Sequence, residues 1–287
     1  MAEPRLCLFG EVLFDHFPDG SRVLGGAPFN VAWHLQAFGQ MPYFISRVGN
    51  DPDGEAVRRA METWGMDECG LQTDDRLPTG SVGVRFTDGE PSYDIVHPSA
   101  YDAIDAAREV PPCRLLYHGS LALRDAASRG ALAAIMATGP ELVFVDVNLR
   151  SPWWSVGAVL SLLRDADWVK LNRDELALLH PDADARAFIA IHDLQGLILT
   201  HGGEGAEVFT VDGAYHQASP DGSVQVVDTV GAGDAFASVM ILGIAHGWSL
   251  SQTLRRAQDF ASRMVGQRGA TVSDMAFYSP LRRDWNL

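Results

Sequence analysis

Short apolar runs with strand character alternate with segments of helical periodicity along most of this chain. The expected strands are Leu6–Val12, Tyr43–Val48, Leu115–His118, Leu142–Val147, Trp168–Leu171 and Gly196–Thr200. The expected helices include Ala27–Phe38, Ala126–Ala137 and one that begins at Pro52, is capped by Asp51 and ends before Gly65. Such alternation is typical of a mostly parallel β-sheet with helices packed on it. The chain is therefore predicted to be an α/β protein.

β-like segments of a different kind interrupt this alternation in two places. Ser81–Phe86 and Ser92–Val96 flank the turn composition of Thr87–Pro91, so a hairpin is expected there. Its position between helical units suits a lid. Farther along the chain, antiparallel strands at the edge of the sheet are predicted around Val208, Tyr215 and Val224.

The charge balance of the chain is strongly acidic. Lys and Arg number 22 and Asp and Glu 37, which gives a formal net charge of −15 at pH 7. Such a chain repels the phosphates of nucleic acids and anionic membrane surfaces, so neither is an expected partner. An anionic ligand such as a nucleotide would need a local positive site or a metal ion.

The sequence also favours a cytoplasmic location. The N-terminus lacks the basic segment and apolar core of a signal peptide. The longest near-apolar stretch, Ala235–Ala245, is about half of the roughly 20 residues that a membrane-spanning helix needs. Cys7, Cys69 and Cys113 are widely spaced, and we interpret them as free thiols, buried or half-buried, in a reducing compartment.

The most informative segment for function is Val226–Phe236, where a β-like run ends in a turn of small residues. An apolar helix is expected to begin at about Gly233. Glycines let backbone N–H groups converge, and at a helix N-terminus these groups attract anions. The segment therefore predicts a site for a phosphate, or for the charge that develops as a phosphate is transferred.

Asp234 lies in the first turn of this expected helix. Taken alone, it could simply complement the helix dipole. Ala235–Ala245, however, is apolar on nearly every side, so the helix is expected to be buried, with its N-terminus near the strand ends where α/β ligand sites lie. A carboxylate there can accept a hydroxyl proton while the amides face a phosphate, which is an arrangement for phosphoryl transfer.

Two signatures resemble those of the ribokinase-like sugar kinases, the phosphofructokinase B family. Asp228–Asp234 is similar to the C-terminal signature and Gly25–Ala32 to the N-terminal one. Their order and separation of about 200 residues are far more specific than one glycine-rich loop. The resemblance implies one domain over residues 1–287: a three-layer α/β/α sandwich with a mostly parallel central sheet and a small β lid from about residues 12–26 and 72–98.

The resemblance implies the following roles in phosphoryl transfer. Asp234 matches the catalytic base, which takes the proton of the sugar hydroxyl as that hydroxyl attacks the γ-phosphate of ATP. The backbone at Gly231, Ala232 and Gly233 matches the anion hole. The residues that match the nucleotide-binding positions are Thr200, Gly202, Gly205, Gly231 and Gly233.

It also implies a sugar site. Asp15 matches the carboxylate that holds sugar hydroxyls, and Gly25, Gly26 and Asn30 match the sugar-binding turn. Asn30 can both donate and accept hydrogen bonds, although without the resemblance it could equally bond its own backbone at a helix start. Arg150 could contact sugar or phosphate, or form only a surface ion pair.

Metal ions are expected at two places. Asn172 and Glu175 resemble the Asn-x-x-Glu element of the family, which is associated with Mg²⁺, and Glu175 could act through water. The same two residues could form a capping box, and both interpretations can hold together. Asp228 lies where many relatives hold a monovalent cation, often K⁺, together with Gly266–Thr271.

The substrate is less constrained than the reaction. Ala27 and Leu13 stand where ribokinases typically carry Lys and Asn, which disfavours ribose, whereas Ala27–Asn30 and Asp146–Trp154 resemble the fructokinase branch. A phosphosugar would need extra cationic groups, and near the expected sugar site the chain offers Arg22, Arg85 and Arg150. It offers no lysine there, because its only lysine is Lys170, and this favours a neutral sugar over a phosphosugar. D-fructose is therefore the expected substrate. The alternatives are another sugar such as 2-keto-3-deoxygluconate, or a sugar-sensing relative without catalysis.

Two further expectations concern an alternative enzyme class and the assembly of the protein. A dinucleotide-dependent oxidoreductase would need Gly-x-Gly-x-x-Gly directly after the first strand, and Gly10–Leu13 does not supply it. Lids in this family often pair, so a homodimer through the lid is a candidate assembly.

Overall fold

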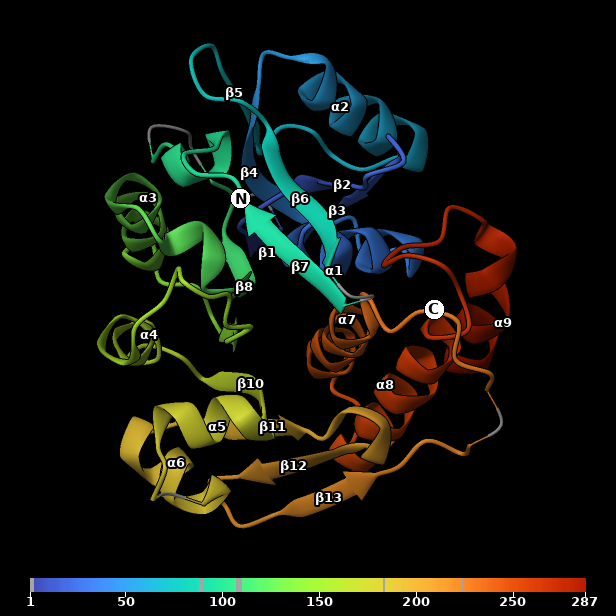
Figure 1. The fold of residues 1–287 in the computed structure, drawn as a ribbon. Coiled ribbons are helices and arrows are strands. Elements are labelled where there is room, and N and C mark those ends of the chain that lie inside the picture. The colour runs from blue at the N-terminus through green and yellow to red at the C-terminus, as the bar shows by residue number, and fades with distance from the viewer. Residues whose placement is uncertain (1–2, 88–89, 107–109, 183, 223) are drawn as a thin grey trace. The chain divides into compact units, whose positions relative to one another are not determined.

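The computed structural model describes residues 3–87, 90–106, 110–182, 184–222 and 224–287. The chain divides into two compact units. Unit 1 comprises residues 1–112, 122–139 and 271–287, and unit 2 comprises residues 113–121 and 140–270. The ribbon in Figure 1 follows the elements of each unit along the chain.

Unit 1 contains three strands that pair in parallel. They are β1 (Arg5–Phe9), β4 (Tyr43–Gly49) and β5 (Leu71–Asp74), in the order β1-β4-β5. The helices of this unit are α1 (Ala27–Ala37), α2 (Pro52–Trp64), α3 (Ala126–Met136) and α9 (Met275–Trp285), with a 3₁₀ turn at Ala100–Ala103. Apart from residues near their ends, β1, β4, α1, α2 and α3 lie where the sequence predicts them, whereas β5 and α9 were not predicted.

A separate four-stranded sheet also belongs to unit 1. Its order is β3-β2-β6-β7, formed by β3 (Arg22–Gly25), β2 (Leu13–His16), β6 (Gly80–Thr87) and β7 (Glu90–Ile95). β6 and β7 pair antiparallel, which confirms the predicted hairpin; residues 88 and 89 of its turn lie outside the described chain. β2 pairs with β3 antiparallel and with β6 parallel, so one sheet joins two segments far apart in sequence (Figure 1).

Unit 2 contains six strands, each hydrogen-bonded to the next one along the chain. β8 (Cys113–His118), β9 (Val143–Asp146), β10 (Trp168–Asn172) and β11 (Gly196–Thr200) are parallel, and β12 (Ala206–Thr210) and β13 (Tyr215–Ala218) continue the sheet antiparallel. Its helices are α4 (Val156–Leu162), α5 (Arg173–Leu179), α6 (Ala185–His192), α7 (Ala232–His246) and α8 (Leu250–Met264). A 3₁₀ turn spans Gly202–Glu204.

The apolar segment after Asp234 forms a buried helix, as predicted. From Ala235 to Ala245, every residue of α7 except Ile244 is buried. At Gly243, a Cβ would lie 2.3 Å from the Thr253 side chain, so this glycine lets α7 and α8 pack closely. Close packing on all sides fixes the N-terminus of α7 in unit 2, and the candidate transfer site is built on that N-terminus.

Two predictions about local structure are wrong. Val224 lies in no strand; instead, the amides of Val227 and Asp228 both bond to the carbonyl of Val265, at 2.8 and 3.1 Å. A single shared carbonyl cannot replace the regular ladder of a strand. Cys69 is exposed rather than buried or half-buried, because it lies in a turn where its amide bonds to Asp67.

The three cysteines are unpaired in the structure. Cys7, Cys69 and Cys113 are free thiols, as predicted. Within the described ranges, no helix combines the length and apolarity that crossing a membrane requires.

Candidate active site

The N-terminus of α7 has the geometry of an anion site. Gly231 caps the helix with φ 78°, in the left-handed region, and a Cβ on it would lie 2.4 Å from the Cα of Ala270. Both observations require glycine. No side chain in the described ranges caps this helix end. The Ala232 amide lies 3.3 Å from the Thr229 carbonyl, and the amides of the first turn are directed out of the helix end, where they favour negative charge.

Asp234 stands in the first turn of α7, close to those amides. Its side chain is half-buried. A carboxylate at this position can reach a bound ligand while α7 holds its backbone rigidly. The predicted helix start at about Gly233 and the predicted place of Asp234 therefore agree with the structure.

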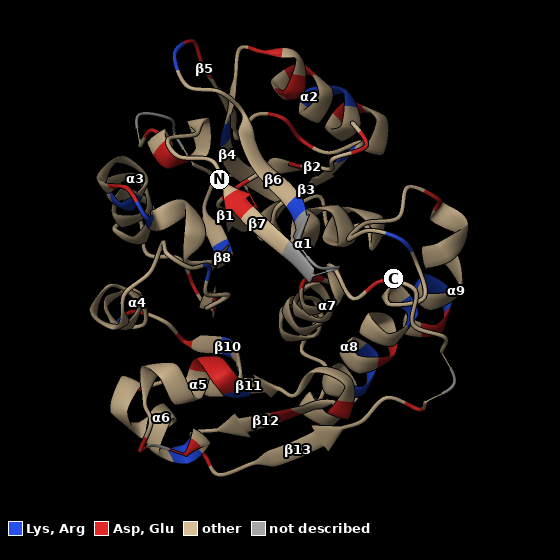
Figure 2. Ribbon diagram, viewed as in Figure 1, with Lys and Arg blue, Asp and Glu red and all other residues tan. Residues whose placement is uncertain are grey.

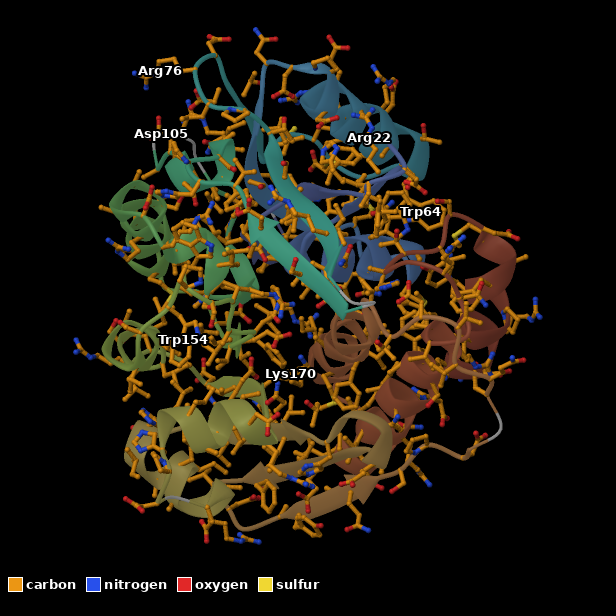
Figure 3. All side chains as sticks on the ribbon, in the orientation of Figure 1. Arg22, Trp64, Arg76, Asp105, Trp154 and Lys170 are labelled. Carbon is orange, nitrogen blue, oxygen red and sulfur yellow. The ribbon has the colours of Figure 1, made fainter. Side chains whose placement is uncertain are left out.

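Lys170 and Asp146 form a buried ion pair on the neighbouring strands β10 and β9. The Nζ atom of Lys170 lies 2.9 and 2.8 Å from the two carboxylate oxygens of Asp146. The side chains are only 9% and 2% exposed. Burial alone would lower the pKa of Lys170, but the charge and hydrogen bonds of Asp146, together with Asp234 and Glu175, raise the pKa overall. Lys170 is therefore an ammonium held by Asp146. Figure 3 labels its side chain.

Asn172 and Glu175 form a reciprocal capping box at the start of α5. The Asn172 Oδ1 atom accepts from the Glu175 amide, and Glu175 Oε2 accepts from the Asn172 amide, both at 2.9 Å. Glu175 Oε1 accepts from the Leu149 amide at 2.8 Å. Burial raises the pKa of Glu175 against the opposing effect of these bonds. Figure 2 shows the acidic start of α5 in red.

The predicted nucleotide loop follows β11. Asn172 and Thr200 are register partners at the ends of β10 and β11, and Thr200 Oγ1 lies 3.5 Å from the Leu171 carbonyl. Gly202 has φ 56° and Gly205 φ 112°. A Cβ on Gly205 would lie 2.1 Å from the Ala218 carbonyl oxygen, so only glycine fits. The loop is thus held tightly beside the Asn172–Glu175 capping box.

His201 lies within this loop and is held as a structural residue. Its Nε2 atom lies 2.8 Å from Glu207 Oε2, and its side chain is 12% exposed. The partnership with Glu207 accounts for His201 as a residue that holds the loop in place.

Asp228 joins two loops of unit 2. Its Oδ1 atom accepts from the Val230 amide and its Oδ2 atom from the Gly269 amide, each at 3.0 Å. The segment before α7 is thereby tied to the loop that contains Ala270, against which Gly231 packs. The two segments expected to hold a monovalent cation are therefore in contact.

Unit 1 brings the predicted sugar-site residues together. A Cβ on Gly25 would lie 3.9 Å from both Asp15 Oδ2 and Asn30 Oδ1, and 4.0 Å from Asn30 Nδ2. Gly25 therefore faces both polar side chains. Gly26 has φ 109°, and a Cβ on it would lie 2.6 Å from the Glu11 carbonyl oxygen, so glycine is required where α1 begins. Asn30 is buried and Asp15 half-buried.

Arg150 is an exposed residue of the segment after β9. Its carbonyl accepts from the Trp153 amide at 2.8 Å, which closes a turn. Across the described ranges its guanidinium has no acidic partner within ion-pair distance, so the surface ion pair expected as its alternative role is not formed.

Sequence reasoning missed the structural importance of the Asp146–Lys170 pair. From the sequence, Lys170 stands out only as the single lysine. Asp146 stands out only as part of a segment that resembles fructokinases. The available signal was a charged residue between Val169 and Leu171, in the middle of an apolar strand. Buried charges are rare unless they are paired, so this lysine predicts a nearby carboxylate.

The chain is similar to known carbohydrate kinases. Residues 6–276 match the pfkB family of carbohydrate kinases. Fructokinase from Escherichia coli is 34% identical, over 98% of this chain and 97% of the relative. Aminoimidazole riboside kinase from Salmonella typhimurium is 32% identical, over 87% of this chain and 84% of the relative.

A solved structure adds likeness in three dimensions. It is a double mutant of fructokinase from Vibrio cholerae O395 in a form with fructose, ADP and potassium ion bound. Its TM-score is 0.81 and its identity 28%, over 96% of this chain and 97% of that chain.

The chain therefore belongs to the pfkB family of carbohydrate kinases. It is a phosphotransferase that acts on a sugar, and it has the ribokinase-like α/β fold with a mostly parallel sheet that its sequence predicts.

Proposed function

We propose that this kinase transfers the γ-phosphate of ATP to a hydroxyl of D-fructose. The hydroxyl oxygen forms the new bond to the γ-phosphorus, the bond from that phosphorus to the β–γ bridging oxygen breaks, and ADP leaves. Asp234 accepts the hydroxyl proton. The observation that carries this proposal is the N-terminus of α7, where amides without a side-chain cap and one carboxylate share the first turn.

The nucleotide phosphates bind at glycine-rich backbone in unit 2. Gly231, Ala232 and Gly233 supply amides to the transferred phosphoryl group, and the loop at Thr200, Gly202 and Gly205 contacts the rest of the phosphate chain. The tight turn at Gly205 and the left-handed backbone at Gly231 support these roles, because both let amides converge.

Mg²⁺ fits the donors near the start of α5. Asn172 and Glu175 offer oxygens, which Mg²⁺ prefers. Both oxygens of Glu175 already accept backbone bonds, so Glu175 holds the ion through water rather than directly. Bound Mg²⁺ would neutralise phosphate charge. K⁺ is proposed at Asp228 and the adjoining loop around Gly269, because Asp228 ties these two segments together.

Fructose is proposed to bind at Asp15, Gly25, Gly26 and Asn30. Gly25 leaves open space before one carboxylate and one amide, which suits a polyol without a charged group. Arg150, exposed and without an acidic partner across the described ranges, contacts the sugar or a phosphate.

The four-stranded sheet is proposed as a lid of a single kinase domain, over about residues 12–26 and 72–98. It would exclude water, so that ATP is not simply hydrolysed. Exposed apolar residues on or beside this sheet, Val23, Tyr93 and Val96, support a homodimer formed through it. The cytoplasmic location expected from the sequence stays a prediction.

A sugar panel tests the proposed substrate. ADP release with MgATP and K⁺ is measured with fructose, aminoimidazole riboside, 2-keto-3-deoxygluconate, ribose, glucose and no sugar. We expect the highest kcat/KM with fructose. A higher value for another sugar would reject fructose while leaving the kinase assignment intact. A protein that binds ATP but responds to no sugar would favour the non-catalytic sugar sensor.

A further inference from the structure

The single lysine of the chain is buried at the candidate transfer site. Of the 22 Lys and Arg residues, all but Lys170 are arginine. Lys170 lies on β10 between the apolar residues Val169 and Leu171, and its side chain is nine-tenths buried. Taking a charge out of water costs several kcal/mol unless a partner offsets it. A buried ammonium at this place therefore calls for an explanation beyond solubility.

The position of the ammonium relates Lys170 directly to the anion hole. Its Nζ atom lies 3.6 Å from the place that a Cβ on Gly233 would occupy. A side chain at position 233 would fill the space between the ammonium and the first turn of α7. Glycine keeps that space open, so the ammonium and the first-turn amides can face the same group.

Asp146 fixes the ammonium without using all of its hydrogen-bonding capacity. An ammonium has three N–H donors, and the two oxygens of Asp146 lie 2.9 and 2.8 Å from Nζ. The Tyr117 hydroxyl lies 3.3 Å from Asp146 Oδ2 and orients the carboxylate from β8. Two strands besides β10 thus hold the lysine in place, and among the described residues no further acceptor takes the third donor, which can reach a ligand.

We propose that Lys170 is a catalytic residue that contacts the phosphoryl group during transfer, and that Asp146 is its positioning residue. The inference rests on the proposed transfer of phosphate at α7. Charge on the oxygens of the phosphoryl group is met from one side by the amides at Gly231–Gly233. Lys170 meets it from the strand side, with no reorganisation because its place is set before ATP binds.

The alternative to a catalytic role is that Lys170 and Asp146 form an ion pair that only stabilises the fold. Replacing both members of such a pair by neutral groups is often neutral for stability, whereas removing one member leaves an uncompensated buried charge. The two explanations therefore differ in a double variant. If the pair is structural, neutralising both residues restores what a single change loses. If Lys170 contacts phosphate, the double variant stays slow.

The experiment compares Lys170→Met, Asp146→Asn and the double variant with the wild type. With fructose, or whichever sugar of the panel is phosphorylated, we expect Lys170→Met and the double variant to lose about 100-fold in kcat. KM for ATP and sugar should stay within about threefold. The matched control is an equally buried pair in unit 1, Arg124 and Asp102, which lie 2.6 Å apart and are 3% and 1% exposed. Arg124→Met with Asp102→Asn should leave kcat within about threefold of the wild type.

A binding measurement tests the inference apart from turnover. Aluminium fluoride with MgADP mimics the phosphoryl group in transfer, and its affinity is measured by calorimetry with and without sugar. Lys170→Met should weaken this complex about 100-fold while MgADP alone binds within about threefold of wild type.

Several outcomes would overturn the inference. They are recovery of kcat in the double variant, equal affinity of wild type and Lys170→Met for the aluminium fluoride complex, or an equal loss for MgADP alone. A wild type that phosphorylates no sugar would instead contradict the proposed function, and the binding measurement would still decide the role of Lys170.

Discussion

Lys170 stands among three carboxylates in unit 2. The charges of Asp146, Asp234 and Glu175 all raise its pKa. One ammonium does not balance three carboxylates, and ATP brings further negative charge. The first-turn amides of α7 offset part of this charge, and the proposed Mg²⁺ would offset the rest.

We therefore predict that ATP binds about tenfold more weakly in EDTA than in Mg²⁺, which corresponds to about 1.4 kcal/mol. Calorimetric titration of the wild-type protein measures this difference. AMP, which lacks the β- and γ-phosphates, is the control and should bind equally in both solutions. Equal affinity for ATP with and without Mg²⁺ would contradict a metal site near Asn172 and Glu175.

Asp15 gives the prediction for the sugar. Because Asp15 faces Gly25 and Asn30 in unit 1, Asp15→Ala should raise KM for fructose at least about tenfold, the loss expected for a hydrogen bond to a charged group. ATP affinity should be almost unchanged. Asp19→Ala, in the exposed turn between β2 and β3, is the control and should leave both constants alone. Collapse of ATP binding in Asp15→Ala would show that the sugar site is misplaced.

At this scale the sequence predicted polar pairs but not the buried charges. The spacing of Asn172 and Glu175 predicted a capping box, and the structure confirms it because that bond is local. The Asp146–Lys170 pair could not be predicted in the same way, since it depends on the register between β9 and β10. Asp15 and Asn30 likewise meet only through folding of unit 1, and the resemblance to the family, not their spacing, pointed to them.

The start of α2 is the clearest case at the scale of elements. Asp51 Oδ1 accepts from the Gly54 amide and from Thr79 Oγ1, both at 2.7 Å, and Oδ2 accepts from the Thr79 amide at 2.8 Å. Burial by itself would raise the pKa of Asp51, but these bonds lower it overall. The cap therefore also ties α2 to the chain that enters β6.

We predict that Asp51→Ala lowers the free energy of unfolding by about 1–2 kcal/mol at pH 7. Because the folded pKa is lowered, the contribution of Asp51 is complete above the unfolded value near 3.9 and is lost as pH falls through the folded value. The difference from wild type should thus be constant from about pH 6 to 8 and shrink below about pH 4. Urea unfolding measures it.

The control for this prediction is Asp184→Ala, because Asp184 caps α6 through one bond to the Ala187 amide. It should cost less than Asp51→Ala. A loss that grows as the pH falls below 4, or no loss at pH 7, would show that the Asp51 bonds do not stabilise the fold.

Element boundaries were predictable where a residue forces them. Asp51, Pro52 and Gly65 set the limits of α2, and Gly65 adopts the left-handed conformation expected at a helix end. The predicted strand at Val224 failed because β propensity does not supply a pairing partner. Val226 and Val227 stay largely exposed, and the amides of Val227 and Asp228 share the single carbonyl of Val265 rather than pairing with a strand.

For the whole molecule, we predict a dimer that forms through the four-stranded sheet. Sedimentation equilibrium should give about twice the 31.2 kDa mass of one chain. Tyr93 is 59% exposed, and Tyr93→Arg should shift the protein toward the monomer, since a charge would be buried in the contact. Met41→Arg, exposed outside that sheet, is the control. A wild-type monomer at micromolar concentration would reject the dimer.

The most direct test of the kinase account is ADP release with MgATP, K⁺ and fructose by wild type and Asp234→Asn. Asn keeps the shape of the side chain but cannot accept the hydroxyl proton. We predict fructose-dependent ADP release by the wild type and a kcat about 10²–10⁴-fold lower in Asp234→Asn, the range for loss of a general base. A near-normal kcat in Asp234→Asn would contradict the assignment of Asp234, and with it the proposed chemistry at α7.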